Sequence, residues 1–437
     1  MLYVSGPGGF VGITCGCKQS TQVKKYYEEM ITNTAHPVNK YASSANLFIH
    51  IFAIPVNHKL DKEHLLRLLH INMANIKHLA AILALPLLAQ TQTTKAQGVE
   101  VAPSDPGITY TGRIVTTNPS GYRFSYPGTT ITASFDATGV KMHCKPRSGY
   151  FMVQIDDSEP FKVAFMGEKD SLVQVATALP RGRHTLRAMY CIEGYEYKPE
   201  FRGLVLDDGG TLLAPPQAPS RKIEFIGNSI TCGYGSESID PNEHFSFETE
   251  NHYIGYAQVA TRALNAQTHI VARSGIGVYR NYGGPREGTP ELNMPSQYEY
   301  TLYDDKSETW DFTRFTPDVV CINLGTNDLS TQNYDIRRFK AAYKKFLETV
   351  RKHNAKAKIV ILCGSMLSGK ELQDAQNALD EVAEETAKKG DKEVYRFNFT
   401  PQDGKLQYGA DWHPSRWQHE KMGAELTAYL RSLMNWW

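Results

Sequence analysis

The hydrophobic pattern of the chain changes its period near residue 214. Between residues 107 and 205, apolar and polar positions alternate in short runs that are separated by turn residues. Six of these runs predict strands, at residues 112–115, 122–126, 130–135, 140–144, 150–155 and 185–190. Short strands with no helical pattern between them are typical of an antiparallel sandwich. We therefore predict a jelly-roll-like β-sandwich domain over residues 98–213.

A proline-rich segment, 214–220, follows and predicts a stiff linker. In the domain beyond it, 221–437, short apolar runs alternate with longer patterns of helical period. The short runs predict strands at 223–226, 269–272, 319–324, 359–363 and 394–399. The longer patterns predict helices at 253–264, 336–350, 372–388 and 417–430. Because strands that alternate with crossover helices form a parallel sheet, we predict an α/β domain whose ligands bind at the carboxyl ends of the strands.

Residues 1–97 follow neither pattern. Residues 1–72 show no sustained hydrophobic period, so we predict that they are a disordered extension upstream of the signal peptide. From Met73 the chain has a basic start, an apolar run over 79–89 and a polar exit, which together predict a signal peptide over 73–97. The apolar run is too short to anchor a mature chain across a bilayer. We therefore expect translation to start at Met73, the protein to be exported, and the mature chain to have no membrane span.

Charge and cysteine content narrow the classes of partner. Lys plus Arg (47) nearly balances Asp plus Glu (46), so the net charge of +1 indicates neither nucleic acid nor an anionic membrane as a partner. Of the seven cysteines, five lie beyond the predicted extension, and none has metal-site spacing. We predict no metal and no cofactor. A disulfide between Cys144 and Cys191 is an alternative that the sequence leaves open.

Chemistry-bearing residues follow the predicted strands. Ser229 follows the first strand, Gly277 the second and Asn327 the third, while Asp411 and His413 stand between the fifth strand and the last helix. Because the carboxyl ends of parallel strands meet at one edge of a sheet, we expect these residues to lie together. A serine nucleophile, a histidine base with a nearby carboxylate, and amide donors for an oxyanion are the groups that acyl transfer needs.

Each residue also has a purely structural interpretation. Ser229 could cap the following helix, Gly277 could permit a turn, and Asn327 could stabilise an Asx turn. His413, which precedes a proline, could be an ordinary residue at a helix start. The structural interpretations explain poorly why all the parts occur in order, each at the end of a predicted strand.

Four blocks of the sequence resemble those of the SGNH (GDSL-type) hydrolases. They are Gly-Asn-Ser-Ile-Thr at 227–231, Gly277, Gly-Thr-Asn-Asp at 325–328 and Asp-Trp-His-Pro at 411–414. The resemblance covers residues 221–437 and implies a flavodoxin-like three-layer sandwich. Asn228 departs from the pattern, because the family usually has Asp there; that residue mainly supports the turn.

Three further features point to one family within this superfamily. They are the preceding β-domain, the Gly-Tyr-Gly sequence at 233–235 and the stretch 274–282. Together they resemble carbohydrate esterase family two, secreted bacterial enzymes that remove O-acetyl groups from polysaccharides such as xylan and mannans. The resemblance implies an acetylated polysaccharide or oligosaccharide as the substrate, and a secreted or periplasmic location in a bacterium.

The resemblance also implies a role for each site residue. Ser229 would attack the acetyl carbonyl, His413 would act as the base and Asp411 would orient His413. The oxyanion would lie among the backbone N–H groups of Ser229 and Gly277 and the side-chain amide of Asn327. Two further residues are candidates for contact with the sugar: Trp412, which could instead pack against the last helix, and Tyr279.

Two other functions stay open. A lipase or acyl-thioesterase of the same fold would need a broad apolar crevice, whereas residues 273–310 are rich in Tyr, Asn, Gly and Glu. A non-catalytic carbohydrate-binding protein would not need the intact set of Ser229, Asn327 and His413.

Overall fold

The structure is a computed structural model that describes residues 2–6, 9–13, 98–169 and 171–437. The chain forms two compact units, Met1–Gln92 and Thr93–Trp437. In the first unit, β1 (Leu2–Gly6) and β2 (Gly9–Ile13) pair antiparallel, a hairpin that the pattern of residues 1–72 did not predict. The rest of the predicted extension and the predicted signal peptide, 73–97, lie outside the described residues.

The second unit begins with two antiparallel sheets that pack face to face, which confirms the predicted β-sandwich. One sheet has the order β10-β7-β12-β3, with β5 also paired to β12; the other has the order β13-β6-β11-β8-β9, with β4 also paired to β6. The strands are β3 (Val99–Val101), β4 (Ile108–Thr111), β5 (Tyr122–Arg123), β6 (Thr130–Asp136), β7 (Val140–Cys144), β8 (Gly149–Ile155), β9 (Phe161–Phe165), β10 (Leu172–Ala176), β11 (Arg183–Tyr190), β12 (Glu200–Leu206) and β13 (Thr211–Leu213).

Alternation along the strands builds the core between these sheets. In β8 every second residue, including Phe151 and Val153, is buried against the other sheet. The predicted strand at 112–115 is wrong, because β4 ends at Thr111, where Gly112 takes a φ of +117°. Strands β9, β10 and β12 were not predicted; β9 and β10 lie at sheet edges, where each exposes a large apolar side chain, Phe161 or Leu172.

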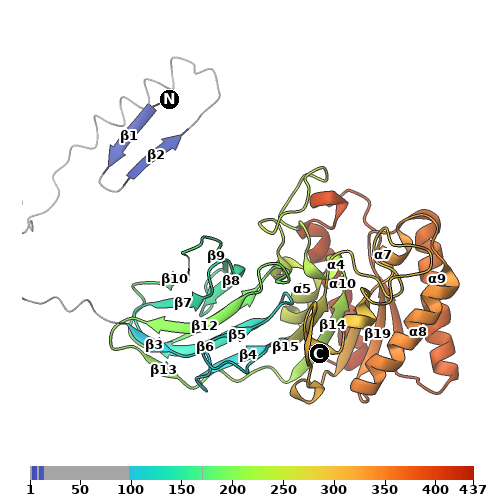
Figure 1. The fold of residues 1–437 in the computed structure, drawn as a ribbon, viewed down its shortest axis with the longest axis horizontal. Coiled ribbons are helices and arrows are strands. Elements are labelled where there is room, and N and C mark those ends of the chain that lie inside the picture. Colours follow the sequence, from blue (N-terminus) through green and yellow to red (C-terminus); the bar gives the residue numbers. More distant parts are fainter. Residues whose placement is uncertain (1, 7–8, 14–97, 170) are drawn as a thin grey trace, which may run out of the picture. The chain divides into compact units, whose positions relative to one another are not determined.

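The rest of the second unit is the predicted parallel α/β domain (Figure 1). Its sheet has the order β15-β14-β18-β19-β20, and all of its strands are parallel. The strands are β14 (Arg221–Gly227), β15 (Ala266–Ala272), β18 (Val319–Asn323), β19 (Lys358–Cys363) and β20 (Val394–Asn398). The long helices are α5 (Tyr256–Ala263), α8 (Ile336–His353), α9 (Gly369–Lys388) and α10 (Arg416–Met434). Between them lie short elements: α4 (Ser229–Cys232), η2 (His252–Ile254), α6 (Met294–Gln297), β16 (Tyr300–Leu302), β17 (Asp305–Thr309), η3 (Phe312–Arg314), α7 (Thr326–Leu329) and η4 (Ala410–Trp412).

Two hydrophobic cores, one on each face of the sheet, make this domain a three-layer sandwich. On one face, α8 and α9 pack on residues such as Ile226 and Ile322; on the other, α5 and α10 pack on residues such as Phe225 and Cys321. The arrangement agrees with the SGNH architecture that the sequence resemblance implied. Among the described helices, none is both long and apolar enough to cross a membrane.

A buried ion pair joins the β-sandwich to the α/β domain. Arg113, just after β4, places a guanidinium nitrogen 3.3 Å from a carboxylate oxygen of Glu224 on β14, and neither side chain is more than 3% exposed. Arg113 also donates to the carbonyl oxygens of Tyr298 and Tyr300. Because both charges are removed from water, each depends on the other for compensation.

The described cysteines are free and buried. Cys144 and Cys191 therefore do not form the bridge that the sequence left open.

Candidate active site

Ser229 stands at a tight turn between β14 and α4. Asn228 precedes the helix with extended backbone angles, and its side-chain oxygen accepts a hydrogen bond from the backbone N–H of Ile230 at 3.1 Å. Asn228 is therefore the helix cap, and the interpretation of Ser229 as the cap is wrong. Gly227 permits the turn, since a Cβ there would lie 2.0 Å from the hydroxyl oxygen of Thr231. The hydroxyl of Ser229 is free of any capping role.

The structure brings His413 to Ser229. The His413 Nε2 atom lies 2.8 Å from the Ser229 Oγ atom, although 184 residues separate them along the chain. Removal from water lowers the pKa of His413 from 6.5 to about 4. The imidazole is therefore neutral near pH 7, and the hydrogen bonds at its other nitrogen assign the proton to Nδ1, which leaves Nε2 to accept from Ser229.

The prediction that the carboxylate of Asp411 orients His413 is contradicted. His413 Nδ1 lies 3.2 Å from two main-chain carbonyl oxygens, those of Ala410 and Asp411. The Asp411 carboxylate instead accepts hydrogen bonds from the hydroxyl of Tyr234 at 2.6 Å and the backbone N–H of Phe245 at 3.0 Å. The backbone is unusual here: Asp411 and Trp412 have consecutive positive φ values, +47° and +62°, and the Asp411 carbonyl rather than its carboxylate lies near the histidine ring.

Tyr234 forms the other support of His413. Its ring stacks on the imidazole with centroids 3.9 Å apart and an interplanar angle of 24°. Its hydroxyl donates to Asp411, so the tyrosine links the carboxylate to the face of the histidine. The Asp411 carboxylate thus acts on His413 through Tyr234 and through the backbone fold, not by direct contact.

Two of the predicted oxyanion donors have an N–H hydrogen that is unused within the described part of the chain. The backbone N–H of Ser229, at the first position of α4, makes no hydrogen bond within the described part of the chain. Asn327, the second residue of α7, is buried, and its side-chain amide donates one hydrogen to the carbonyl of Ile276 at 2.8 Å. Since an amide carries two hydrogens, this bond fixes the side chain and leaves the second hydrogen available.

Gly277 does not offer a free donor. Its backbone N–H donates to the side-chain oxygen of Asn281 at 3.1 Å, so the structure contradicts its assignment to the oxyanion hole. Glycine is required there for space, because a Cβ would lie 1.9 Å from the carbonyl oxygen of Arg280. Gly275, two residues earlier, makes no hydrogen bond through its N–H within the described residues, and its φ of +76° favours glycine. Gly275 is the better candidate for the third donor.

Asp328 anchors the loop that carries these glycines. Its buried carboxylate accepts hydrogen bonds from the consecutive backbone N–H groups of Val278, Tyr279 and Arg280 at 2.8–3.2 Å. Burial raises the pKa of this carboxyl to about 6, against the lowering effect of these hydrogen bonds. The Gly-Thr-Asn-Asp block therefore supplies both a candidate oxyanion donor and the anchor of the neighbouring loop.

The two predicted sugar-contact residues differ in position. Tyr279 is 4% exposed, and its hydroxyl accepts a hydrogen bond from the backbone N–H of Asp335, so it packs inside the domain and cannot contact a sugar. Trp412 is 54% exposed and tilts against Tyr408, with ring centroids 5.1 Å apart. Its role as a stacking surface stays a prediction.

The β-sandwich also contributes to the site, which the sequence did not indicate. Glu193, in the segment after β11, is buried and accepts hydrogen bonds from both the backbone N–H (2.7 Å) and the hydroxyl of Ser274. Ser274 directly precedes Gly275. The backbone N–H of Glu193 donates in turn to Glu250 at 3.0 Å, and Arg273 lies 3.7 Å from the Glu193 carboxylate. Glu193 of the β-sandwich thus holds the loop of the α/β domain that contains Ser274 and Gly275.

Glu193, Glu250 and Cys232 bring potential ligand atoms within 4.8 Å of one another, a spacing that a metal site could use. Their contacts already have a structural explanation, because Ser274 occupies both oxygens of Glu193 and Arg273 supplies a positive charge. Burial raises the pKa of Glu250 well above its ordinary value and that of the Cys232 thiol likewise.

A row of partly buried aromatic rings runs from His413 to the β-sandwich. Tyr234 stacks on Phe245 (4.5 Å between centroids), which contacts Phe247 (4.9 Å). Phe247 contacts two tyrosines of the β-sandwich, Tyr195 at 6.3 Å and Tyr197 at 4.9 Å. The Gly-Tyr-Gly sequence singled out Tyr234, but nothing in the sequence linked it to rings of the preceding domain.

The comparisons with known proteins agree with this architecture. Residues 110–216 match the family model described as carbohydrate esterase 2 N-terminal, and residues 225–421 match the GDSL-like lipase/acylhydrolase family. A solved structure of a family two carbohydrate esterase from Clostridium thermocellum, in complex with cellohexaose, superposes with a TM-score of 0.70. It is 36% identical, and the alignment covers 76% of this chain and 100% of that one.

Two curated proteins are also similar. The cellulase/esterase CelE of Acetivibrio thermocellus is 36% identical over 332 residues, which make up 76% of this chain but only 40% of that protein. An acetylxylan esterase / glucomannan deacetylase of Cellvibrio japonicus is 29% identical over 79% of this chain and 94% of that protein.

Proposed function

Because the chain belongs to the family two carbohydrate esterases, we propose that it removes O-acetyl groups from plant cell-wall polysaccharides, acetylated xylan or mannan, through an acetyl-serine intermediate. The observation that carries this proposal is the 2.8 Å contact between Ser229 Oγ and a neutral His413 Nε2. The acetylxylan and glucomannan activities named for the similar Cellvibrio japonicus protein support the choice of substrate.

In the first half-reaction, His413 Nε2 takes the proton of the Ser229 hydroxyl as the oxygen attacks the acetyl carbonyl. The negative charge that develops on the carbonyl oxygen is stabilised by the N–H of Ser229, the amide of Asn327 and the N–H of Gly275. The protonated imidazole then gives its proton to the departing sugar oxygen, and acetyl-serine remains.

In the second half-reaction, His413 activates a water molecule that attacks the acetyl-serine, and acetate leaves. The main-chain carbonyls of Ala410 and Asp411 hold the Nδ1 proton of His413 during both steps. Carbonyl dipoles stabilise the imidazolium less than a carboxylate would, so Tyr234 and the nearby Asp411 charge assist by their position.

The aromatic row and Trp412 suit a sugar ligand. Pyranose rings stack on exposed aromatic faces, and Trp412 presents such a face beside His413. The partly buried rings of Phe245 and Phe247 continue the aromatic row from Tyr234 toward the β-sandwich. We infer that a polymer chain lies across both domains while one acetyl group enters the site.

The direct test is to incubate the protein with acetylated xylan, acetylated glucomannan and acetylated pectin and to measure the acetate released. We expect acetate from xylan or glucomannan, and a loss of about 10⁶-fold in kcat for Ser229→Ala on an aryl acetate. A fluorophosphonate should label the parent protein but not Ser229→Ala. Near-parental turnover by a folded Ser229→Ala protein would sink the assignment.

A chain-length series of aryl esters separates this function from that of a lipase or acyl-thioesterase of the same fold. We expect the highest kcat/KM for acetate and a steep decline with longer acyl chains. A preference for long chains would overturn the proposal.

We also propose that the protein is secreted or periplasmic in a bacterium. The support is the pattern of residues 73–97 together with a polymeric substrate that lies outside the cell. Fractionation of a producing strain, followed by N-terminal sequencing of the exported protein, would test this; an intact N-terminus in the cytoplasm would contradict it.

A further inference from the structure

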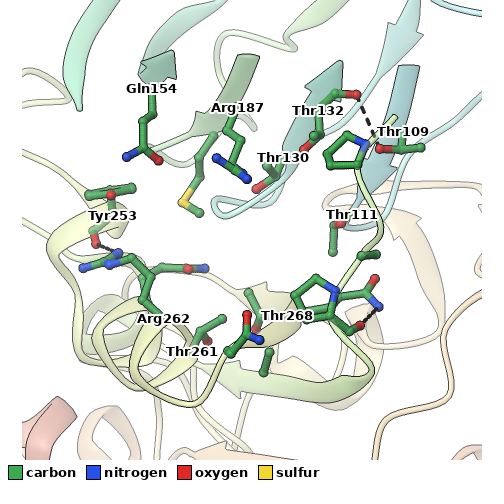
Figure 2. A pocket seen from close by; sticks show the side chains of 18 of the residues that line it. Thr109, Thr111, Thr130, Thr132, Gln154, Arg187, Tyr253, Thr261, Arg262 and Thr268 are labelled. Carbon is green, nitrogen blue, oxygen red and sulfur yellow. Dashed lines mark hydrogen bonds between the residues drawn. The ribbon is translucent and has the colours of Figure 1, made fainter. Parts of the chain in front are cut away.

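A cavity of about 430 Å³ lies between the β-sandwich and the α/β domain (Figure 2). One wall is a face of the sheet that contains β4, β6, β11 and β8, and the other wall comes from α5 and the first residues of β15, with the linker at one side. Its volume is in the range that holds small organic ligands. The cavity shares no lining residue with the catalytic turn, which stands at the other end of β15.

Strand register places the polar lining of the sheet in two rows. Thr109 pairs with Thr132, Thr132 with Arg187, and Arg187 with Gln154 across four neighbouring strands. Beside it, a second row contains Thr111, Thr130, Met189 and Met152. Because side chains alternate along a strand, these residues share the face opposite the core.

The α/β domain completes the cavity with further polar groups. Figure 2 shows the side chains of Arg262, Thr261 and Thr268 on the wall facing Arg187 and Gln154. Thr268 is 5% exposed, yet its hydroxyl has no hydrogen-bond partner within the described residues. A buried hydroxyl without a partner is unfavourable, so this wall of the cavity keeps unused hydrogen-bonding capacity.

The charged residues in the lining are Arg187 and Arg262, and it contains no carboxylate. Arg262 donates to the carbonyl of Tyr253 at 2.7 Å, and its guanidinium carbon lies 4.2 Å from the centroid of the Tyr253 ring. Arg187 is exposed, and its guanidinium has no hydrogen-bond partner among the described residues. Asp156, whose pKa the charge of Arg187 helps to lower, is already bonded to His184 and Thr185.

We propose that this cavity is a second, non-catalytic glycan site that binds a uronic-acid-bearing oligosaccharide. Threonine hydroxyls and glutamine amides donate and accept hydrogen bonds, as sugar hydroxyls require. The guanidinium of Arg187 binds the uronate carboxylate, because the planar arrangement of its N–H donors matches the two carboxylate oxygens. The site would hold the polymer while the separate catalytic site removes acetyl groups, and binding there does not depend on Ser229.

The test is calorimetric titration of the full protein with xylotetraose that carries one glucuronic acid residue, with neutral xylotetraose as the matched ligand. We expect the acidic ligand to bind more tightly, and Arg187→Gln to weaken its binding about tenfold. Arg187→Gln should leave the affinity for the neutral ligand and kcat/KM on an aryl acetate unchanged. Ser229→Ala should bind the acidic ligand as the parent does.

The matched control is Arg147→Gln, which removes an exposed arginine elsewhere on the β-sandwich, where it pairs with the exposed Glu168. We expect no change in affinity. A second variant, Thr132→Phe, narrows the cavity without changing charge and should weaken both ligands. Parental affinity in Arg187→Gln, an equal loss in Arg147→Gln, or parental affinity in Thr132→Phe would each overturn the proposal.

Discussion

Asp411 illustrates at the scale of one residue how a sequence motif and its geometry differ. Its carboxylate faces Tyr234 and Phe245, whereas its carbonyl faces His413. In a serine triad that uses a carboxylate directly, Asp→Asn lowers kcat by about 10⁴-fold because the histidine takes the wrong tautomer.

For this site we predict a much smaller effect of Asp411→Asn, a loss of about tenfold or less in kcat, because main-chain carbonyls keep the tautomer. Steady-state kinetics on an aryl acetate would measure it, with the melting temperature as a check on folding. A loss near 10⁴-fold in a folded variant would show that the carboxylate contacts His413 during the reaction.

The low pKa of His413 has a consequence for pH dependence. Catalysis needs the neutral imidazole, and burial lowers its pKa from 6.5 to about 4. We predict that kcat/KM stays level as pH falls from 7 to about 5 and then declines as pH passes through about 4. An NMR titration of the His413 ring would locate the same transition; a midpoint near 6.5 would contradict the structure.

Asn327 tests the oxyanion assignment. We predict that Asn327→Ala lowers kcat by about 10² to 10³-fold with little change in KM, because the lost donor acts mainly on the transition state. Asn281→Ala is a useful comparison, since Asn281 supports the same loop through Gly277 rather than facing the reaction. An equal loss in both variants would mean that Asn327 acts only by holding the loop.

At the scale of elements, the segment after β11 reaches from the β-sandwich to the loop that follows β15. Glu193 binds Ser274 through the backbone N–H and the hydroxyl, and Gly275 follows directly. A buried side chain of the β-sandwich thus supports the loop that carries Gly275.

We predict that Glu193→Gln lowers kcat by about 10 to 100-fold and changes KM little, since the oxyanion donors would be less well positioned. Glu196→Gln, an exposed change in the same segment, should leave both constants unchanged. A Glu193→Gln protein with parental kcat would show that Glu193 does not position the oxyanion donors.

At the scale of the whole second unit, Arg113 and Glu224 couple the two domains. Removal of one partner leaves a buried charge uncompensated, and such changes cost about 3–5 kcal/mol. We predict that Arg113→Met lowers the free energy of unfolding by about this amount, and that the parent unfolds in one transition because the domains share this buried contact.

Chemical denaturation followed by tyrosine and tryptophan fluorescence would measure the change. The double variant Arg113→Met, Glu224→Met should recover part of the loss, because no isolated charge remains. Equal stability of Arg113→Met and the parent, or two separate transitions in the parent, would contradict the coupling.

The sequence by itself determined the elements and the order of the catalytic parts. Helix α8 begins at Ile336 and strand β18 at Val319, as the pattern predicted, because amphipathic period and buried apolar runs are local properties. The positions of Ser229 and His413 followed from the rule that parallel strands carry ligands at their carboxyl ends. The same rule could not distinguish Gly277 from Gly275, since both follow β15.

Only the tertiary structure decided how those parts are held. Whether Asp411 offers its carboxylate or its carbonyl depends on the unusual backbone of two consecutive residues, Asp411 and Trp412, both with positive φ. Whether Tyr279 is exposed depends on how its side chain packs inside the domain. The contact of Glu193 with Ser274 joins residues 81 positions apart in two domains. Such contacts depend on how whole domains pack, and no local period in a sequence encodes them.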